Sequence, residues 1–365
     1  MDTAPLFRPF TCRGLTIENR IVMAPMTRSF SPDGVPGEDV AAYYERRAAN
    51  DVGLIISEGT TTDRPGASND PRVPNFHEPA ALAGWERVIN QVHAAGGKMG
   101  PQIWHTGMMR KPGSGPIPEA SSDSPSGVTH KGKQIMDPPS QEEIADMAAS
   151  FARAAVSAKN LGFDMIELHG AHGYLIDEFF WDVMNQRDDK YGGSLIDRSE
   201  FAAEIVRLCR EAVGDAMPIS LRISQWKQQD FEARLADTPA ELEKFVAVFA
   251  DAGVDLLHCS QRRFWESEFD GSDLNFAGWV KKLSGVPTIS VGSVGLNSDF
   301  ITSFVGQGAE VSDISGLLER MDREEFDLIA VGRALLHDPL WAQKVKQGRM
   351  DELSAYDGNA LATLF

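Results

Sequence analysis

The feature that most constrains this sequence is an alternation, repeated eight times, between a short apolar run and a longer segment with helical periodicity. The runs are rich in Ile, Val, Leu and Met, and several lack polar alternation, which is typical of parallel strands covered by helices. The eight runs span residues 20–26, 53–58, 98–104, 163–169, 218–223, 254–260, 286–291 and 326–331. The eight helical segments span residues 38–49, 79–95, 141–161, 200–213, 239–252, 276–283, 298–305 and 334–346.

Eight strand–helix pairs predict an α/β protein with a closed (β/α)8 TIM barrel, formed by residues 1–365 as a single domain. In such a barrel the functional site and the long loops lie at the carboxyl ends of the strands. A doubly wound open sheet is the rival architecture. It would require a glycine fingerprint after the first strand, where this sequence has Ala24-Pro25-Met26-Thr27 instead.

Two long segments have no function that the residue pattern indicates. The loop 106–140 follows the third predicted strand, and its Pro/Gly/Ser-rich part is more typical of a surface loop than of a lid. The segment 306–325 separates the seventh predicted helix from the eighth strand and is longer than a barrel connection requires.

Charge and apolar content exclude several classes of partner. The chain has 53 acidic and 35 basic residues and a net charge of −18, which argues against binding to nucleic acid or to anionic membranes. It has no uncharged apolar stretch of about 18 residues, and its first residues lack the order of a secretory signal. We therefore expect a cytoplasmic protein that acts on small molecules.

The three cysteines carry no recognisable site. Cys12, Cys209 and Cys259 are odd in number and far apart, so they give neither a disulfide framework nor the paired spacing of a zinc or iron–sulfur site. We expect each to be a free thiol and predict no metal.

The densest group of polar residues lies at the end of the fourth predicted strand, in the sequence Glu167-Leu-His169-Gly-Ala-His172-Gly-Tyr174. Two imidazoles and a phenol at this spacing can bind one oxygen and supply one proton. One histidine at a strand end is often only a satisfied core group, but two histidines, two glycines and a tyrosine favour a catalytic site. Zinc binding is a weaker alternative, because no third ligand is evident.

Two glycine-containing turns follow the seventh and eighth predicted strands. Gly292 and Ser293 follow the seventh, and Gly332 and Arg333 follow the eighth. In barrel enzymes these two loops frequently bind phosphate through backbone N–H groups, and Arg333 would add a charged contact. Small residues can also serve tight turns alone, but two such turns with an arginine favour a phosphate site.

Three further polar residues lie at predicted strand ends. Arg222 stands in an apolar strand, where it is costly to bury unless an anion or another acceptor faces it. Gln102 offers a donor and an acceptor, which suits the edge of a heteroaromatic ring, and Thr27 offers a hydroxyl. Each could be structural alone. Together with a phosphate site, they indicate a ligand that resembles a nucleotide.

From Leu6 to about Gln347, the sequence resembles the Old Yellow Enzyme family of FMN-dependent ene-reductases. The motifs that carry this resemblance occur in family order. They are Asn-Arg-Ile-Val-Met-Ala-Pro-Met-Thr-Arg at 19–28, Tyr-Tyr-Glu-Arg-Arg-Ala at 43–48, Ser-Glu-Gly-Thr at 57–60, Gln-Ile-Trp-His-Thr-Gly at 102–107, His-Gly-Ala-His-Gly-Tyr-Leu at 169–175 and Asn-Gln-Arg-Asp-Asp-Lys-Tyr-Gly-Gly-Ser at 185–194.

The resemblance implies that the barrel holds FMN noncovalently at its carboxyl-terminal mouth. Residues near the ring would be Pro25, Met26, Thr27, Gly59, Gln102 and Arg222, and residues near the phosphate would be Gly292, Ser293, Gly332 and Arg333. Gly59 would allow backbone to approach the ring, and Arg222 would stabilise the anionic reduced flavin.

The resemblance also implies the chemistry. His169 and His172 would bind the carbonyl or nitro oxygen of an activated alkene, Tyr174 would protonate the α-carbon, and the β-carbon would accept hydride from flavin N5. NADH or NADPH would reduce the flavin first, from the same site, and the protein would be a monomer or a homodimer.

The sequence indicates the remaining pocket residues less clearly. Thr27 and Trp104 would contact the substrate, and Phe264 and Trp265 are further candidate walls. The loop 61–77 lacks the tyrosine that some family members place over the substrate, and Arg64 or Phe76 could take its place.

Two alternative functions follow from the same residues. A phosphate-binding barrel lyase or isomerase would use the histidine pair and Tyr174 as acid and base, without flavin or nicotinamide. A metal-dependent barrel hydrolase would lose activity with a chelator.

Overall fold

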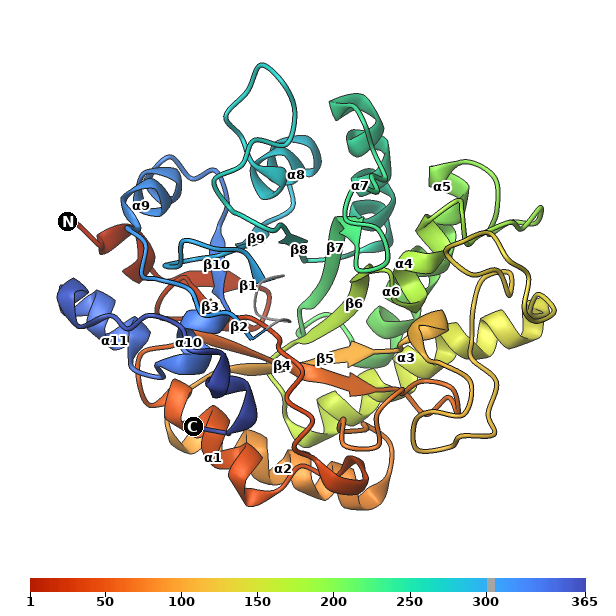
Figure 1. The fold of residues 1–365 in the computed structure, drawn as a ribbon, viewed down its shortest axis with the longest axis horizontal. Helices are drawn as coiled ribbons and strands as arrows, with labels where there is room; N and C mark the ends of the chain where they lie inside the picture. Colours follow the sequence, from red (N-terminus) through yellow and green to blue (C-terminus); the bar gives the residue numbers. More distant parts are fainter. Residues whose placement is uncertain (301–305) are drawn as a thin grey trace.

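Parallel strands form a closed barrel in the computed structural model, which describes residues 1–300 and 306–365. Within these residues eight strands pair in the order β10-β3-β4-β5-β6-β7-β8-β9 (Figure 1). Their bounds are Ile21–Met23 (β3), Leu54–Thr61 (β4), Met99–Trp104 (β5), Ile166–His172 (β6), Ile219–Lys227 (β7), Leu256–Ser260 (β8), Thr288–Val291 (β9) and Leu328–Val331 (β10). The predicted (β/α)8 barrel is confirmed, and the open sheet is excluded.

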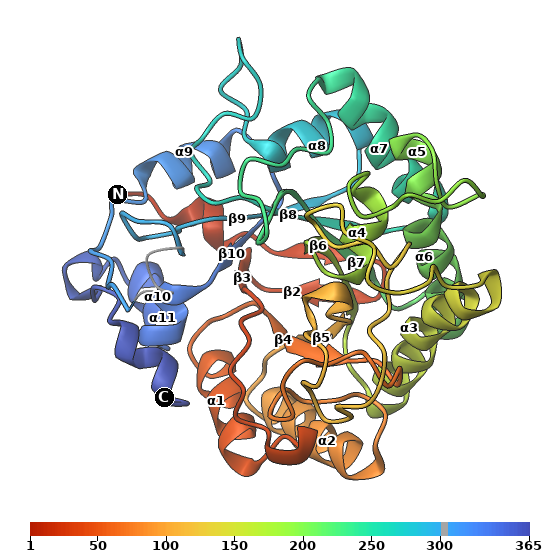
Figure 2. The same ribbon diagram turned by 45° about the vertical axis from the view of Figure 1, so that its right-hand side comes forward.

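The helices surround the strands, as Figure 2 shows. Six of the predicted helical segments agree with the structure to within one residue at either end. These helices are Glu38–Ala48 (α1), Pro79–Ala94 (α2), Gln141–Leu161 (α3), Glu200–Val213 (α6), Pro239–Ala252 (α7) and Phe276–Ser284 (α8). The longest of them, α3, begins at a capping box between Ser140 and Glu143 and ends at Gly162, whose φ is 83°.

The remaining two predicted helices have different outcomes. Residues 301–305, most of the predicted helix 298–305, lie outside the described residues, so this helix stays a prediction. In the part of this connection that the structure describes, an α-helix spans Ser315–Asp322 (α9) before β10. The segment 306–325 is therefore a helical connection rather than a plain spacer. The predicted helix 334–346 divides into Arg333–His337 (α10) and Trp341–Lys346 (α11), because Pro339 has no N–H and favours extended backbone at the preceding Asp338.

A short hairpin that the sequence analysis missed covers the amino end of the barrel. Its strands are Phe10–Cys12 (β1) and Leu15–Ile17 (β2). Phe10, Leu15 and Ile17 form one buried apolar cluster with residues inside the barrel. These barrel residues are Val22, Ala24, Leu54, Ile56, Met165, Leu256, Ile289, Leu328 and Ala330. Since this end is closed, a ligand must enter at the carboxyl end.

Strands β6 and β7 extend further toward this open end than the sequence predicted. They pair up to His172 and Lys227, across a register shift between Gly170 and His172. This pairing sets His169 beside Arg222. Two further short helices, Leu175–Phe180 (α4) and Leu195–Arg198 (α5), follow β6. Among the described residues, no helix is long and apolar enough to cross a membrane.

Candidate active site

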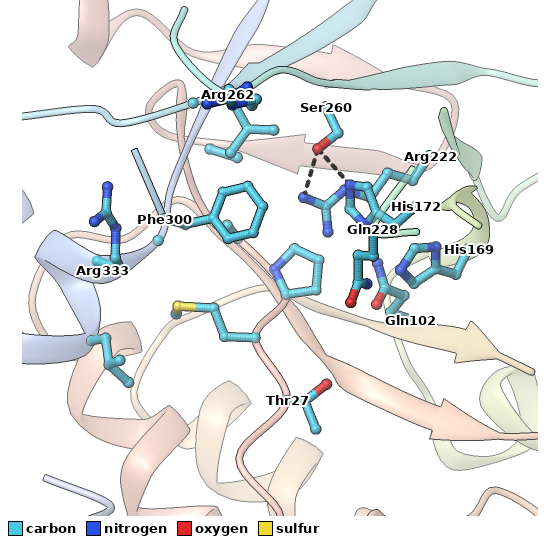
Figure 3. A pocket seen from close by; sticks show the side chains of 18 of the residues that line it. Thr27, Gln102, His169, His172, Arg222, Gln228, Ser260, Arg262, Phe300 and Arg333 are labelled. Atoms are coloured by element: carbon cyan, nitrogen blue, oxygen red, sulfur yellow. Dashed lines mark hydrogen bonds between the residues drawn. The ribbon is translucent and has the colours of Figure 1, made fainter. Parts of the chain in front are cut away.

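A cavity of about 510 Å3 opens at the carboxyl ends of the strands (Figure 3). Its volume is in the range of sites that hold small molecules or cofactors. The structure brings thirteen of the fourteen predicted site residues to this one cavity. They are Pro25, Met26, Thr27, Gln102, Trp104, His169, His172, Tyr174, Arg222, Gly292, Ser293, Gly332 and Arg333.

Gly59 is the one predicted site residue that does not line the cavity. It lies on β4 beneath Trp104, and a Cβ atom there would come within 2.6 Å of the indole Cε3 atom. The absent side chain thus makes room for Trp104, whose ring packs edge-on against Tyr174 with 4.9 Å between centroids. A contact of Gly59 with a bound ring stays a prediction.

Arg222 is a buried cation with an N–H donor that has no hydrogen-bond partner among the described residues. Its Nη2 donates to Ser260 Oγ over 3.4 Å, while its Nε atom has no partner. Burial lowers the pKa of Arg222 to about 10, which leaves the guanidinium charged at neutral pH. A buried donor without a partner is costly, so this corner of the cavity fits a ligand that presents an anionic or carbonyl edge.

Gln102 presents its oxygen to a ligand because its nitrogen is already used. Its Nε2 atom donates to Glu167 Oε1 over 2.9 Å. The other oxygen of Glu167 accepts from Ser220 and pairs with Nδ1 of His258. This buried carboxylate therefore fixes the amide, leaving Oε1 of Gln102 as the acceptor for a ring N–H group.

The two histidines lie side by side, with 5.1 Å between ring centroids. Nδ1 of His169 accepts from the backbone N–H of Ala171 over 3.4 Å, and burial holds its pKa well below the usual range. A neutral His169 then carries its hydrogen on Nε2 and can donate it to a ligand.

His172 has a different environment. Its ring stacks on Trp226 at 4.5 Å, and its Nε2 atom is 2.7 Å from Ser260 Oγ. Burial, followed by the charge of Arg222, keeps its pKa well below the usual range. Ser260 therefore stands between His172 and Arg222, as Figure 3 shows, and a ligand oxygen must compete with this hydroxyl.

Tyr174 completes the polar wall of the cavity. Its ring packs edge-on against His169 with 4.9 Å between centroids, and its Oη atom accepts a hydrogen bond of 2.9 Å from Gln228 Nε2. Burial raises its pKa, so the hydroxyl keeps its proton at neutral pH. A neutral imidazole and a protonated phenol thus line the same cavity.

The far end of the cavity is formed by the loops after β9 and β10. A Cβ atom on Gly292 would lie 2.8 Å from the carbonyl oxygen of Gln261, so only glycine fits there. Arg333 donates to Ser293 Oγ and to the carbonyl oxygen of Asp299, and Arg262 brings a second guanidinium. A narrow backbone turn with two cations suits a phosphate group.

Sequence reasoning missed several lining residues. Ser260 at the end of β8 could have been found by the strand-end argument that found Gln102 and Arg222. Gln228 and Arg262 lie in loops without a local signal, and Tyr356 and Leu361 come from the C-terminal segment. Only the folded chain brings these last two to the cavity.

The other candidate walls are wrong. Arg64 forms ion pairs with Asp123 and Asp146, and Phe76 is buried against Trp85. Neither lines the cavity, nor do the further candidates, Phe264 and Trp265.

A barrel with a buried arginine, a fixed amide oxygen and a narrow cationic turn around one cavity suits a ligand that has a polar ring and a phosphate group. The model of the NADH:flavin oxidoreductase / NADH oxidase family matches residues 5–352. The chain belongs to this family, the Old Yellow Enzyme family, and is an FMN-dependent NAD(P)H oxidoreductase.

Similar proteins span most of this chain. An NADH oxidase of Thermoanaerobacter brockii is 34% identical over 357 residues, which cover 95% of this chain and 52% of the relative. The chain thus spans about half the length of that enzyme. An NADPH dehydrogenase of Bacillus subtilis is 32% identical, with 96% of both chains covered. A structure of morphinone reductase with tetrahydroNAD has a TM-score of 0.80 and 26% identity, covering 98% of this chain and 93% of that one.

Proposed function

We propose that this oxidoreductase reduces the activated C=C bond of α,β-unsaturated carbonyl or nitro compounds with NAD(P)H. The observation that carries the proposal is the pairing of His169 and Tyr174 on one wall of the cavity, 4.9 Å apart by ring centroids. One can donate a hydrogen bond and the other a proton, and the ring-binding groups Gln102 and Arg222 line the same cavity.

The cavity residues fit FMN, which supplies the hydride chemistry when bound. Gln102 would accept a hydrogen bond from the ring through its free amide oxygen, and the orphaned Nε of Arg222 would donate one. The backbone around Pro25, Met26 and Thr27 would line the ring. At the far end, Gly292, Ser293, Gly332 and Arg333 would hold the phosphate.

The substrate would be polarised through its oxygen. His169 donates from Nε2 in its neutral form, which burial maintains. We assign the same role to His172, although an oxygen that binds its Nε2 must displace Ser260 Oγ. Hydrogen bonds in a water-poor cavity stabilise developing negative charge on that oxygen more than they would in water.

Tyr174 would then supply the proton. Because burial raises its pKa, Oη holds a proton that it releases only to a strong base, such as the carbon that becomes negative during reduction. Thr27, which is exposed at the cavity mouth, and Trp104 would contact the remainder of the substrate.

The experiment separates the two half-reactions in Tyr174→Phe. Anaerobic stopped flow follows the visible flavin band as NADPH or NADH reduces the enzyme, and then as an enone or nitroalkene reoxidises it. We expect alkene reduction to slow by about 10²–10⁴-fold, the range for loss of a general acid, while flavin reduction is unchanged. Equal slowing of both steps would remove the assignment of Tyr174.

Tyr191→Phe is the matched control. Tyr191 is a buried tyrosine outside the cavity, and its hydroxyl donates to Glu204 over 2.7 Å. We expect its removal to leave both half-reactions intact. Activity in FMN-free protein would instead support the lyase or isomerase alternative.

We further propose that the enzyme works in the cytoplasm as a monomer or a homodimer. Sedimentation of the FMN-loaded protein measures the oligomeric state, and a larger assembly would contradict it.

A further inference from the structure

Two consecutive residues after β7, Gln228 and Gln229, contact three consecutive residues that begin with the last residue of β6. The backbone N–H of Gln228 donates to the carbonyl oxygen of His172 over 3.3 Å. The side chain of Gln229 donates to the carbonyl oxygen of Gly173 over 2.9 Å. The side chain of Gln228 donates to Tyr174 Oη over 2.9 Å. Two neighbouring glutamines thus hold the same loop, but only Gln228 contacts the phenol.

The hydrogen bond from Gln228 limits the directions in which the O–H hydrogen of Tyr174 can point. A phenolic oxygen carries one hydrogen and accepts through its lone pairs. When an amide N–H occupies the accepting side of Oη, the O–H hydrogen must turn to another partner. The rings of Trp104 and His169 pack edge-on against the ring of Tyr174, and all three residues line the cavity.

We propose that Gln228 is a positioning residue, which holds the Tyr174 hydroxyl with its hydrogen directed into the cavity and stabilises the oxygen after the proton has left. This inference rests on the proposed role of Tyr174 as proton donor. It assigns to the loop after β7 a part in the protonation step, in addition to the part of β7 itself in holding Arg222.

The charges around Tyr174 are consistent with this role. Burial raises the pKa of Tyr174, whereas the hydrogen bond from Gln228 and the charge of Arg222 on β7 lower it. His169 on β6 is neutral, because burial lowers its own pKa, and Trp104 on β5 has no charge. Gln228 is therefore the one hydrogen-bond donor to the Oη atom among the described residues.

Gln228 is held in place by a buried anchor. The preceding Lys227 forms an ion pair of 2.8 Å with Asp177, and both side chains are 0% exposed. The other oxygen of Asp177 accepts from the backbone N–H of Gly173 over 2.7 Å. Because this pair ties the segment that carries Gln228 to the loop that carries Tyr174, the two side chains keep their relative positions.

The test compares Gln228→Leu and Gln228→Glu with Gln229→Leu in the FMN-loaded enzyme. The leucine removes the donor, and the glutamate replaces it with an acceptor of the same size that would draw the phenolic hydrogen away from the cavity. Gln229→Leu removes the neighbouring hydrogen bond to Gly173 without touching the phenol. Stopped flow measures both half-reactions.

We expect both Gln228 variants to slow alkene reduction by about 10-fold, the equivalent of one hydrogen bond, with flavin reduction by NADPH or NADH unchanged. We expect Gln229→Leu to change the two half-reactions by the same factor. Unchanged alkene reduction in Gln228→Glu would show that the amide accepts from Tyr174 and would overturn the proposal. The selective pattern in Gln229→Leu would overturn it as well.

A second measurement is independent of alkene reduction. Tyrosine labelled with 13C at Cζ reports the ionisation of Tyr174 by NMR, with Tyr174→Phe to assign the signal. We expect the pKa of Tyr174 to rise by about one in Gln228→Leu and to stay unchanged in Gln229→Leu. If the wild-type enzyme reduces no activated alkene, the proposed function fails, and this titration still decides whether Gln228 controls the phenol.

Discussion

The substitution Asp177→Asn tests how the buried ion pair supports the active-site loop. It removes the charge of Asp177 but keeps an oxygen that can accept from the Gly173 N–H. Among the described residues, the Lys227 ammonium then keeps two backbone acceptors, the carbonyl oxygens of Ser224 at 3.4 Å and Gln225 at 3.0 Å. Removing one partner of a buried pair costs about 3–5 kcal/mol.

The titration of Lys227 sets an upper limit to this loss in the free energy of unfolding. Lys227 can release its proton instead of remaining charged, and from an ordinary pKa of about 10.4 this takes about 5 kcal/mol at pH 7 and about 2 kcal/mol at pH 9. In the variant the folded state loses a proton that the unfolded state keeps, so its stability relative to wild type rises with pH. The deficit should therefore fall from about 3–5 kcal/mol at pH 7 to about 2 kcal/mol at pH 9.

Urea unfolding at one saturating FMN concentration measures the difference, since bound FMN stabilises the native state of both proteins. With an unfolding entropy of about 2.1 cal/mol/K per residue over 365 residues, a loss of 3–5 kcal/mol lowers Tm by about 4–7 °C. Asp322→Asn is the matched control, because its pair with Arg8 is exposed and should contribute less than about 1 kcal/mol.

Two results would refute this reasoning. One is a loss below about 1 kcal/mol at pH 7, and the other is a deficit that does not shrink at pH 9. Burial raises the pKa of Asp177 and lowers that of Lys227, so desolvation outweighs attraction within the pair. The double variant Asp177→Leu/Lys227→Met should accordingly recover most of the lost stability, while the loop still lacks its anchor at Gly173.

Three further predictions concern the cavity and its surroundings. Arg222→Met removes the buried donor, and we expect FMN to bind about 10–100-fold more weakly in a fluorescence titration of the apoprotein; unchanged affinity would contradict the assignment. Burial raises the pKa of Glu58 from 4.5 to about 7, so the folded chain holds an extra proton in this window and its stability falls as pH rises. In urea unfolding, the free energy of unfolding of Glu58→Gln relative to wild type should therefore rise by about 3 kcal/mol between pH 4 and pH 8. A difference between the two proteins that does not change with pH would contradict this prediction. Arg28 donates to three carbonyl oxygens within residues 360–363 and so holds the C-terminal segment. Arg28→Met should therefore speed both hydrogen exchange in residues 356–365 and FMN release. Exchange at the wild-type rate in this segment would contradict the role of Arg28 in holding it.

Much of the fold could be predicted because its signals are local. The barrel strands are buried on both faces, so each appears as an apolar run, and the helix α3 is bounded by its own cap residues. The helix α9 was missed because its residues are largely polar and glycine is its second residue. The hairpin of β1 and β2 was missed because each strand has only three residues.

Some residues of the site could likewise be predicted from the sequence, and others could not. Arg222 and Gln102 could be predicted because each is a polar residue near the end of a largely apolar strand, and His169 because it belongs to a dense polar motif. The barrel topology brings all these strand ends together. No pattern marks Gln228, because its role depends on a phenol 54 residues away in the sequence. The bond between His172 and Ser260, across 88 residues, is equally invisible in the sequence.

The sequence by itself determined the barrel, the family and many of the polar groups around the cavity, because hydrophobic periodicity and short motifs are properties of neighbouring residues. Only the tertiary structure decided which donor or acceptor of each group is already used. Glu167 takes the amide nitrogen of Gln102, Ser260 takes Nε2 of His172, and Gln228 takes the accepting side of Tyr174. Hydrogen bonds are short-ranged and directional, so these assignments exist only once distant segments have been brought within about 3 Å of one another.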